Sequence, residues 1–204
     1  TYDHLGWRNL VDGPWFSAVP TLTAAAMVTS RIRLGTFVAS PVARHPVPFM
    51  RELNTLDDVS DGRFVLGLGA GVDHTRYDAA VLAAPELTPK QRADRFTEFV
   101  EALDGLLMTD KFDFDGEYYR AREARNLPGP VQRPRLPFVV AANGPRTMTL
   151  AARFGAGWVT TGKGGENLEI YLDRFATNEP VTGAVIEVES PNGSVKATEG
   201  AGGT

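Results

Sequence analysis

Strand-like and helix-like segments alternate along most of this 204-residue chain, and that alternation constrains the fold more than any other feature. Short apolar runs rich in β-branched and aromatic residues predict buried strands, at residues 32–40, 63–69, 138–142 and 157–161. Apolar residues three and four positions apart, with helix-starting and helix-ending residues, predict helices at residues 20–30, 46–59, 88–107, 145–155 and 166–178. This order is typical of βα units, so we expect an α/β protein with parallel strands covered by helices. Periodicity alone leaves open a (β/α)8 barrel and an open doubly wound sheet.

One helix start is marked strongly. Thr88, Pro89 and Gln91 combine a capping-box pattern with proline at the first helical position. Downstream, residues 112–119, with Asp115-Gly116 at their centre, predict a small hairpin.

The end of the chain departs from the βα pattern. Residues 181–204 alternate around Ser190-Pro191-Asn192-Gly193 and then end in small residues and glycines. This composition predicts a hairpin followed by a flexible end. We therefore expect one domain over residues 1–178 and a hairpin-like, flexible C-terminal tail over residues 179–204.

The composition excludes several classes of function. Acidic and basic residues are interspersed at a net charge of -4, so there is no basic stripe for nucleic acid. The chain has no cysteine, which excludes disulfides, thiolate metal sites and a cysteine nucleophile. No apolar run approaches the roughly 18 to 20 residues that a membrane span needs, and the start lacks a signal-peptide pattern. We expect a cytoplasmic protein that binds neither nucleic acid nor membranes.

Asp3 and His4 are the first candidates for chemistry. In parallel α/β folds the reacting groups lie at the carboxyl ends of the strands, in the loops that follow them. A carboxylate beside an imidazole can act as a general acid/base pair, because histidine titrates near neutral pH. A surface or packing histidine is the alternative interpretation.

The glycines of residues 67–71 are the second candidate. The sequence Gly67-Leu68-Gly69-Ala70-Gly71 suggests a dinucleotide fingerprint, but the sixth position of that motif is Val72 and no clear helix begins there. The glycines either let the chain turn at a strand end or let a flat, bulky ligand approach the backbone.

Residues 143–146 are the third candidate, because a strand is followed there by a helix N-terminus. Unpaired N–H groups, the positive end of the helix dipole and the guanidinium of Arg146 would together bind an anion, typically a phosphate. An ordinary turn is the alternative. Arg44-His45 also follows a strand, where a structural role is at least as well supported. No metal-ligand spacing occurs, so we expect no metal site.

Taken together, these segments resemble the luciferase-like monooxygenases. The matching segments follow the family's order: residues 2–5, 30–36, 44–46, 55–64, 66–71, 130–134, 142–146, 150–152 and 155–158. The resemblance implies a (β/α)8 TIM barrel that binds reduced FMN or 8-hydroxy-5-deazaflavin (coenzyme F-420) at the strand carboxyl ends. It also implies that Asp3 and His4 are catalytic residues beside the isoalloxazine ring.

The resemblance assigns the remaining site residues to cofactor binding. In the family, a non-prolyl cis peptide supports the ring in the region of Thr36-Phe37-Val38. The other residues implied to bind the cofactor are Gly69, Ala70 and Gly71 at the ring and Gly144 and Arg146 at the phosphate. The implied reaction is that of an oxidoreductase on a small organic substrate, by oxygen activation and insertion or by hydride transfer.

The length limits what the resemblance implies. A (β/α)8 barrel needs about 250 residues, so we expect a partial barrel whose first strand and last strands are missing. Residues 182–204 weakly resemble the opening hairpin of a penicillin-binding, β-lactamase-like domain. A partial barrel leaves strand edges unpaired, and association of identical chains is one arrangement that would cover them. Two alternatives therefore stay open: a catalytically impaired fragment acting as an assembly module, and an open-sheet nucleotide-binding protein.

Overall fold

The computed structural model describes residues 1–6, 15–71, 78–160, 185–187 and 196–198. The chain divides into two compact units, unit 1 (Thr1–Leu136) and unit 2 (Pro137–Thr204). Each unit is described by itself below.

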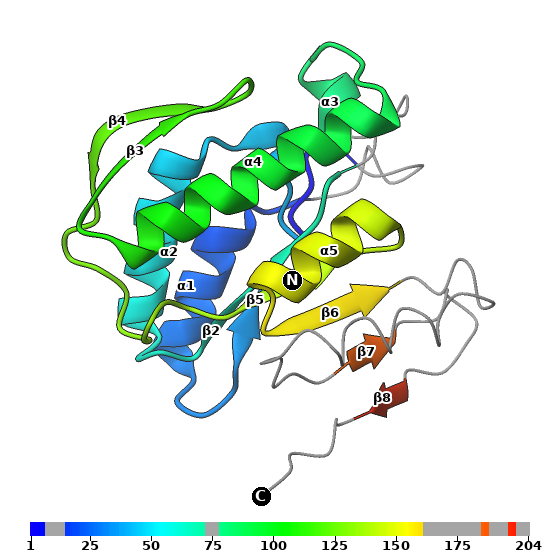
Figure 1. Ribbon diagram of the computed structural model, residues 1–204. Helices are drawn as coiled ribbons and strands as arrows, with labels where there is room; N and C mark the ends of the chain where they lie inside the picture. Colours follow the sequence, from blue (N-terminus) through cyan, green and yellow to red (C-terminus); the bar gives the residue numbers. More distant parts are fainter. Residues whose placement is uncertain (7–14, 72–77, 161–184, 188–195, 199–204) are drawn as a thin grey trace, which may run out of the picture. The chain divides into compact units, whose positions relative to one another are not determined.

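Three long helices make up the helical layer of unit 1. They are α1 (Ala18–Val28), α2 (Pro46–Val59) and α4 (Pro89–Met108), and α2 contacts both of the others (Figure 1). All three predicted helices are confirmed. The predicted capping box is also present, because the Gln91 N–H donates to Thr88 Oγ1 at 3.2 Å and the Thr88 N–H donates to Gln91 Oε1 at 3.0 Å. Two short helices, η2 (Pro41–Ala43) and α3 (Asp78–Val81), lie between them in the chain.

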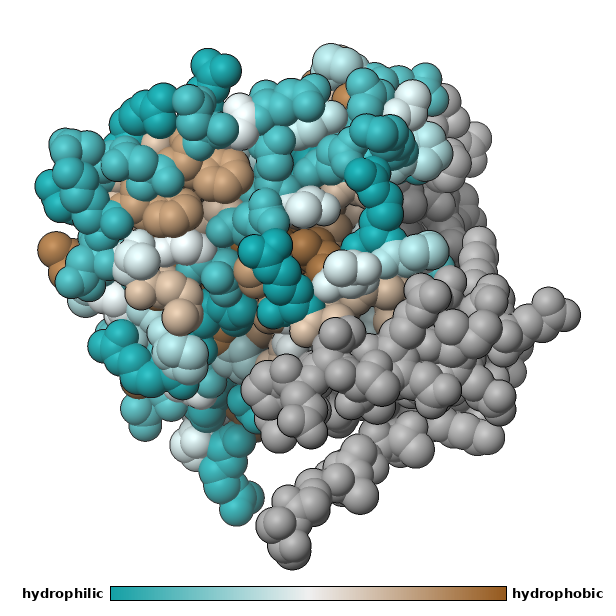
Figure 2. All heavy atoms as spheres, in the orientation of Figure 1, coloured by the Kyte–Doolittle hydropathy of each residue, from teal (hydrophilic) through white to brown (hydrophobic). Residues whose placement is uncertain are grey.

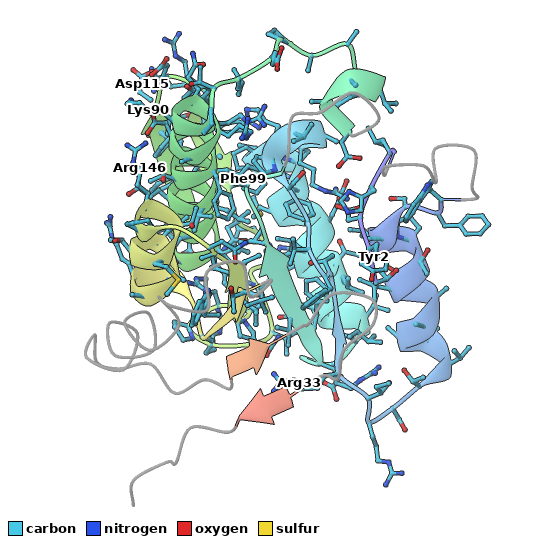
Figure 3. The ribbon with its side chains drawn as sticks, turned by 90° about the vertical axis from the view of Figure 1, so that its right-hand side faces the viewer. Tyr2, Arg33, Lys90, Phe99, Asp115 and Arg146 are labelled. Carbon is cyan, nitrogen blue, oxygen red and sulfur yellow. The ribbon has the colours of Figure 1, made fainter. Side chains whose placement is uncertain are left out.

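The core of unit 1 forms where the apolar faces of α2 and α4 meet. Phe49 and Phe99 are at most 1% exposed and their ring centroids are 6.0 Å apart. In Figure 3, Phe99 lies among closely packed side chains. Burial of each such ring stabilises the fold by roughly 2 kcal/mol. Other fully buried residues of α4 continue the predicted apolar stripe, among them Phe96, Val100, Leu103 and Leu106.

Two strands of unit 1, β1 (Leu34–Gly35) and β2 (Phe64–Leu68), pair in parallel, with Leu34 opposite Phe64. The predicted strand at residues 32–40 is therefore wrong in its extent. Residues 32 and 33 do not belong to the strand, and the Ile32 carbonyl instead accepts a hydrogen bond from the Arg63 guanidinium at 3.0 Å. Beyond β1, pairing resumes only as a single parallel bridge between Ala39 and Leu68.

The first residues of the chain run beside β1. The Thr1 ammonium donates to the Gly35 carbonyl at 2.6 Å, and the Phe37 N–H donates to the Thr1 carbonyl at 2.7 Å. This alternation is the hydrogen-bond pattern of parallel strands. Residues 2–4 therefore leave the sheet at its carboxyl end, beside residues 36–38.

The predicted hairpin is confirmed but turns later in the chain than expected. Its strands are β3 (Lys111–Asp115) and β4 (Arg120–Arg125), so the turn occupies residues 116–119 rather than Asp115-Gly116. The physical reason is Glu98 on α4, whose carboxylate accepts hydrogen bonds from the N–H groups of Glu117 and Tyr118 at 3.0 and 2.9 Å. Hydrophilic residues cover most of the described surface over α4 and this hairpin (Figure 2).

Unit 2 contains two adjacent parallel strands, β5 (Phe138–Ala141) and β6 (Gly157–Thr160), joined by α5 (Pro145–Phe154). These elements confirm the predicted strands and helix. β7 (Val185–Glu187) pairs in parallel with β6, and β8 (Lys196–Thr198) pairs antiparallel with β7. The helix predicted at residues 166–178 and the boundary at residues 178–179 lie outside the described residues. No helix among the described residues is long and apolar enough to cross a membrane.

Candidate active site

The carboxyl end of the unit 1 sheet brings several predicted site residues together. Thr36 is 4% exposed, and its Oγ1 donates to the Gly67 carbonyl at 2.8 Å. The Ala39 N–H donates to the same carbonyl at 2.8 Å, and the Gly69 N–H donates to the Ala39 carbonyl at 2.9 Å. These bonds place residues 36–39 beside residues 67–69. The Phe37–Val38 peptide is cis, at the position that the family resemblance indicates.

The Asp3 carboxylate is held by the guanidinium of Arg44. Arg44 Nε donates to one carboxylate oxygen at 2.9 Å and Nη2 to the other at 2.8 Å, while Nη1 donates to Glu52 at 3.0 Å. The guanidinium also lies 4.3 Å from the centroid of the Phe49 ring. The side chains of Arg44 and Asp3 are only 14% and 11% exposed, so this bidentate pair is shielded from water. The geometry fixes the Asp3 carboxylate in a defined orientation.

His4 is held by a different carboxylate, that of Asp78 at the start of α3. His4 Nδ1 lies 2.9 Å from Asp78 Oδ2, and Oδ1 accepts hydrogen bonds from the N–H groups of Leu5 and Gly6 at 2.6 and 3.1 Å. Burial acts to raise the pKa of Asp78, but the bonds from His4, Gly6 and Leu5 together lower it below its ordinary value of 3.8. Asp78 is therefore ionised at neutral pH and fixes the imidazole.

Two aromatic side chains flank the His4 ring. The Tyr2 ring stacks with a centroid distance of 6.3 Å, and the Trp15 ring meets His4 edge-on at 6.0 Å. Tyr2 is 62% exposed, whereas the His4 side chain is 14% exposed. The imidazole therefore lies against two aromatic rings, with Asp78 bound at Nδ1.

The glycine-rich segment after β2 is explained in part by the fold alone. A Cβ at Gly67 would lie 2.0 Å from the Thr36 carbonyl oxygen, which the adjacent chain does not permit. Gly71 has a φ of 74°, in the region that favours glycine, and a Cβ there would lie 2.7 Å from a Val42 methyl group. The close packing of the chain thus requires both glycines, and ligand contact at Gly69, Ala70 and Gly71 stays a prediction.

In unit 2, the predicted anion site is the N-terminus of α5. Gly144 is the N-cap residue, and its carbonyl accepts a hydrogen bond from Thr147 Oγ1 at 3.1 Å. Its φ of -139° suits any residue, and a Cβ there would meet nothing within 4 Å among the described residues. Local packing therefore does not explain a glycine at this position. Arg146 lies on the first turn of the same helix and is exposed.

The neighbouring residue Asn143 has a structural role. Its Oδ1 accepts a hydrogen bond from Thr160 Oγ1 at 2.7 Å, which joins the loop after β5 to the end of β6. Trp158 Nε1 makes a similar link by donating to the Ala142 carbonyl at 2.7 Å. These bonds fix the backbone that leads into α5.

The two members of the Arg44-His45 pair have different roles. Arg44 belongs to the site through Asp3, whereas His45 caps α2, because its Nδ1 accepts a hydrogen bond from the Val47 N–H at 3.3 Å. The His45 ring packs edge-on against Tyr119 at 5.6 Å. Burial raises the pKa of Tyr119 to about 12, so its hydroxyl stays protonated and donates to the Pro41 carbonyl at 3.2 Å.

Sequence reasoning missed Asp78. It lies in a stretch without periodicity, 74 residues from His4, and no motif connects the two positions. The one available signal was an acidic residue shortly after a glycine-rich strand end. The described residues contain no group of three or more His, Cys, Asp or Glu side chains that could hold a metal ion.

Comparison with known protein families shows which family this chain matches. The family model of the luciferase-like monooxygenases matches residues 1–179. The chain belongs to this family. An F420-dependent glucose-6-phosphate dehydrogenase of Beutenbergia cavernae is 38% identical over 167 residues, which are 80% of this chain and 48% of the relative. An uncharacterised protein of Mycobacterium tuberculosis is 36% identical over 72% of this chain and 49% of its own length. This luciferase-like chain thus spans about half the length of the curated relatives it matches.

Solved structures agree with the family assignment. The monooxygenase RslO1 from Streptomyces bottropensis is 26% identical and matches with a TM-score of 0.77 over 92% of this chain and 57% of its own. An F420-dependent secondary alcohol dehydrogenase, solved with an F420-acetone adduct, shares the fold with a TM-score of 0.73 at 22% identity. The luciferase-like chain therefore has the α/β fold of the TIM-barrel type predicted from its sequence.

Proposed function

We propose that this chain carries the cofactor-binding and acid/base residues of a luciferase-like oxidoreductase that acts on a small organic substrate. The observation that carries the proposal is the pair of fixed side chains at the carboxyl end of the unit 1 sheet. Arg44 orients Asp3, and Asp78 orients His4. The chain that carries Asp3 and His4 begins beside the segment with the cis peptide, because the Phe37 N–H donates to the Thr1 carbonyl at 2.7 Å.

The proposed cofactor is reduced FMN or 8-hydroxy-5-deazaflavin, in keeping with relatives that are F420-dependent. Either group supplies or accepts the electrons of the reaction, and the protein supplies binding, orientation and charge. Thr36 to Val38 and Gly69 to Gly71 would hold its ring. The backbone suits this role, because the three residues that follow β2, Gly69 to Gly71, are too small to block a flat ring.

The phosphate of the cofactor is assigned to Gly144 and Arg146 of unit 2. Gly144 suits this role, because its extended backbone and open surroundings do not require glycine, whereas close approach of a ligand to its N–H would. The helix N-terminus contributes N–H donors and positive potential, and Arg146 contributes a guanidinium.

His4 is assigned the proton transfer. Asp78 holds Nδ1, which sets the tautomer, so we assign proton exchange with the substrate to Nε2. The aromatic side chains of Tyr2 and Trp15 limit water around the ring. Asp3 is paired with Arg44, so its proposed role is to present a carboxylate of fixed orientation beside the reacting atoms.

The experiment is a titration of the purified chain with FMN and, separately, with the deazaflavin. We expect a shift in the visible absorption of the cofactor and a higher Tm. A His4→Gln variant should bind the cofactor as tightly as the wild type, because the proposal gives His4 no anchoring role. Absence of both the spectral shift and the stabilisation with both cofactors would contradict the proposal.

A further inference from the structure

Large apolar side chains are exposed around the His4–Asp78 pair. Four of them are between 45% and 62% exposed: Tyr2, Leu5, Val81 and Leu82. The Tyr2 ring stacks on the His4 imidazole with a centroid distance of 6.3 Å. The Leu5 N–H donates to Asp78 Oδ1 at 2.6 Å. Tyr2 and Leu5 therefore adjoin the pair to which proton transfer is assigned.

The short helix α3 brings Val81 and Leu82 to the same place. Its first residue is Asp78, and the Leu82 N–H donates to the Asp78 carbonyl at 3.1 Å, so this turn is helical. Residues three and four positions apart lie on one side of a helix. Val81 and Leu82 therefore lie on the side of α3 whose carboxylate holds His4.

This grouping of exposed side chains is not the usual distribution on a surface. Single exposed apolar residues are normal on a soluble protein. Several of them around a partly buried polar pair are typical of a ligand-binding groove, in which apolar walls surround a few polar groups. The surroundings of His4 therefore suit a ligand with an apolar body and one polar group.

The charged groups that the structure describes here already bind one another. The Arg44 guanidinium donates to Asp3 and to Glu52. The Asp78 carboxylate accepts hydrogen bonds from two backbone N–H groups and lies 2.9 Å from His4 Nδ1. An anionic substrate would approach the Asp78 carboxylate without an uncommitted cation among these groups, and like charges repel. An uncharged substrate carries no such penalty.

We propose that the substrate of this oxidoreductase is an uncharged, largely apolar molecule whose single polar group is a hydroxyl or a carbonyl. The polar group binds at His4 Nε2, and the apolar remainder packs against the four exposed side chains. This substrate class rests on the proposed function, because the proton exchange assigned to His4 fixes which end of the molecule reacts. Burial of each additional CH₂ group of the substrate should strengthen binding about fourfold.

The test measures the Kd of the whole chain for 1-butanol, 1-hexanol, 1-octanol and octanoate. Quenching of tryptophan fluorescence reports binding, because the centroid of the Trp15 ring lies 6.0 Å from that of the His4 ring. The Kd should fall at least tenfold from 1-butanol to 1-hexanol. Octanoate should bind at least tenfold more weakly than 1-octanol, because its charge would be buried without a partner. Equal affinities along the alcohol series, or octanoate binding as tightly as 1-octanol, would overturn the proposal.

Two exposed valines provide matched variants. Val81→Ser replaces an apolar contact of the proposed site with a hydroxyl and should weaken binding of 1-octanol about tenfold. Val28→Ser makes the same change at the last residue of α1, outside the proposed site, and should leave binding unchanged. Because both side chains are exposed, both variants should fold. Equal loss in the two variants would indicate nonspecific adsorption of the alcohol and refute the site.

A parallel titration with FMN and with the deazaflavin separates this substrate class from the proposed function. A response to a cofactor without a preference for longer alcohols would overturn the apolar substrate and leave the proposed function standing. A preference for longer alcohols that Val81→Ser removes, with no response to either cofactor, would support the apolar site and contradict the proposed function.

Discussion

The two units present their predicted site residues in opposite ways. In unit 1, Arg44 binds Asp3 and Asp78 binds His4, each at 2.8–2.9 Å, and all four side chains are largely buried. In unit 2, Gly144 lies in open surroundings and Arg146 is exposed. A residue held by its own fold contributes to stability as well as to function, whereas Gly144 has no local contact that requires glycine, so its proposed role is in binding. Substitutions should therefore affect stability in unit 1 and only binding in unit 2.

The largest expected effect is in unit 1, at Arg44. Arg44→Ala leaves the Asp3 carboxylate without its bidentate partner and also removes the contact with the Phe49 ring. We expect a loss of about 3 kcal/mol in the free energy of unfolding, as for other shielded ion pairs that lose one member. Urea denaturation measures it. A loss below about 0.5 kcal/mol would show that the pair is only a surface ion pair.

The second-largest loss of stability is expected for Asp78→Asn. The change removes a charge-assisted hydrogen bond to His4 and weakens those from Leu5 and Gly6, so we expect about 2 kcal/mol of destabilisation at neutral pH.

The pH dependence gives this prediction a second readout. The pKa of Asp78 is lowered in the folded state, so its stabilisation is complete above the ordinary value of 3.8 and is lost as the pH falls through the folded pKa. The free energies of unfolding of wild type and Asp78→Asn, measured by urea denaturation, should therefore converge as the pH falls below 3.8. A difference that stays constant with pH would contradict the ionised pair.

Two glycine substitutions sharpen the comparison between the units. Gly71→Ala in unit 1 forces a Cβ onto a positive φ and against Val42, so about 1 to 2 kcal/mol of stability should be lost. Thermal and urea unfolding measure it, and a neutral outcome would mean that the loop rearranges freely.

Gly144→Ala in unit 2 should have the smallest effect on stability, within about 0.5 kcal/mol of the wild type. Its Cβ meets nothing nearby and its backbone is extended. Cofactor affinity should nevertheless fall, because the methyl group lies where the phosphate is assigned. Fluorescence titration with FMN checks this, and unchanged affinity would remove Gly144 from the site.

How far the sequence predicted the structure depended on whether the signals were local. The capping box at Thr88 and the apolar stripe through Phe99 are local patterns, and both were correct. The strand predicted at residues 32–40 was too long, because the Ile32 carbonyl accepts a hydrogen bond from a residue far along the chain, Arg63. The hairpin turn moved because Glu98, on another element, binds its N–H groups.

In the candidate site, too, local patterns could be predicted and contacts between distant residues could not. Asp3 and His4 could be proposed as site residues because they are adjacent and match a family pattern, but their pairing with Arg44 and Asp78 could not be predicted. Arg44 lies 41 residues from Asp3, and Asp78 lies 74 residues from His4. Such pairs are set by the fold of the whole unit, and residue type and spacing along one chain do not specify them.

The most direct test of the central claim is the affinity of the chain for FMN and for riboflavin, which lacks the phosphate, in wild type and Arg146→Gln. If unit 2 holds the phosphate, wild type should bind FMN at least tenfold more tightly than riboflavin, and Arg146→Gln should lose most of that preference while its affinity for riboflavin is unchanged. An equal preference for FMN in both proteins, or weaker riboflavin binding in the variant, would contradict the account.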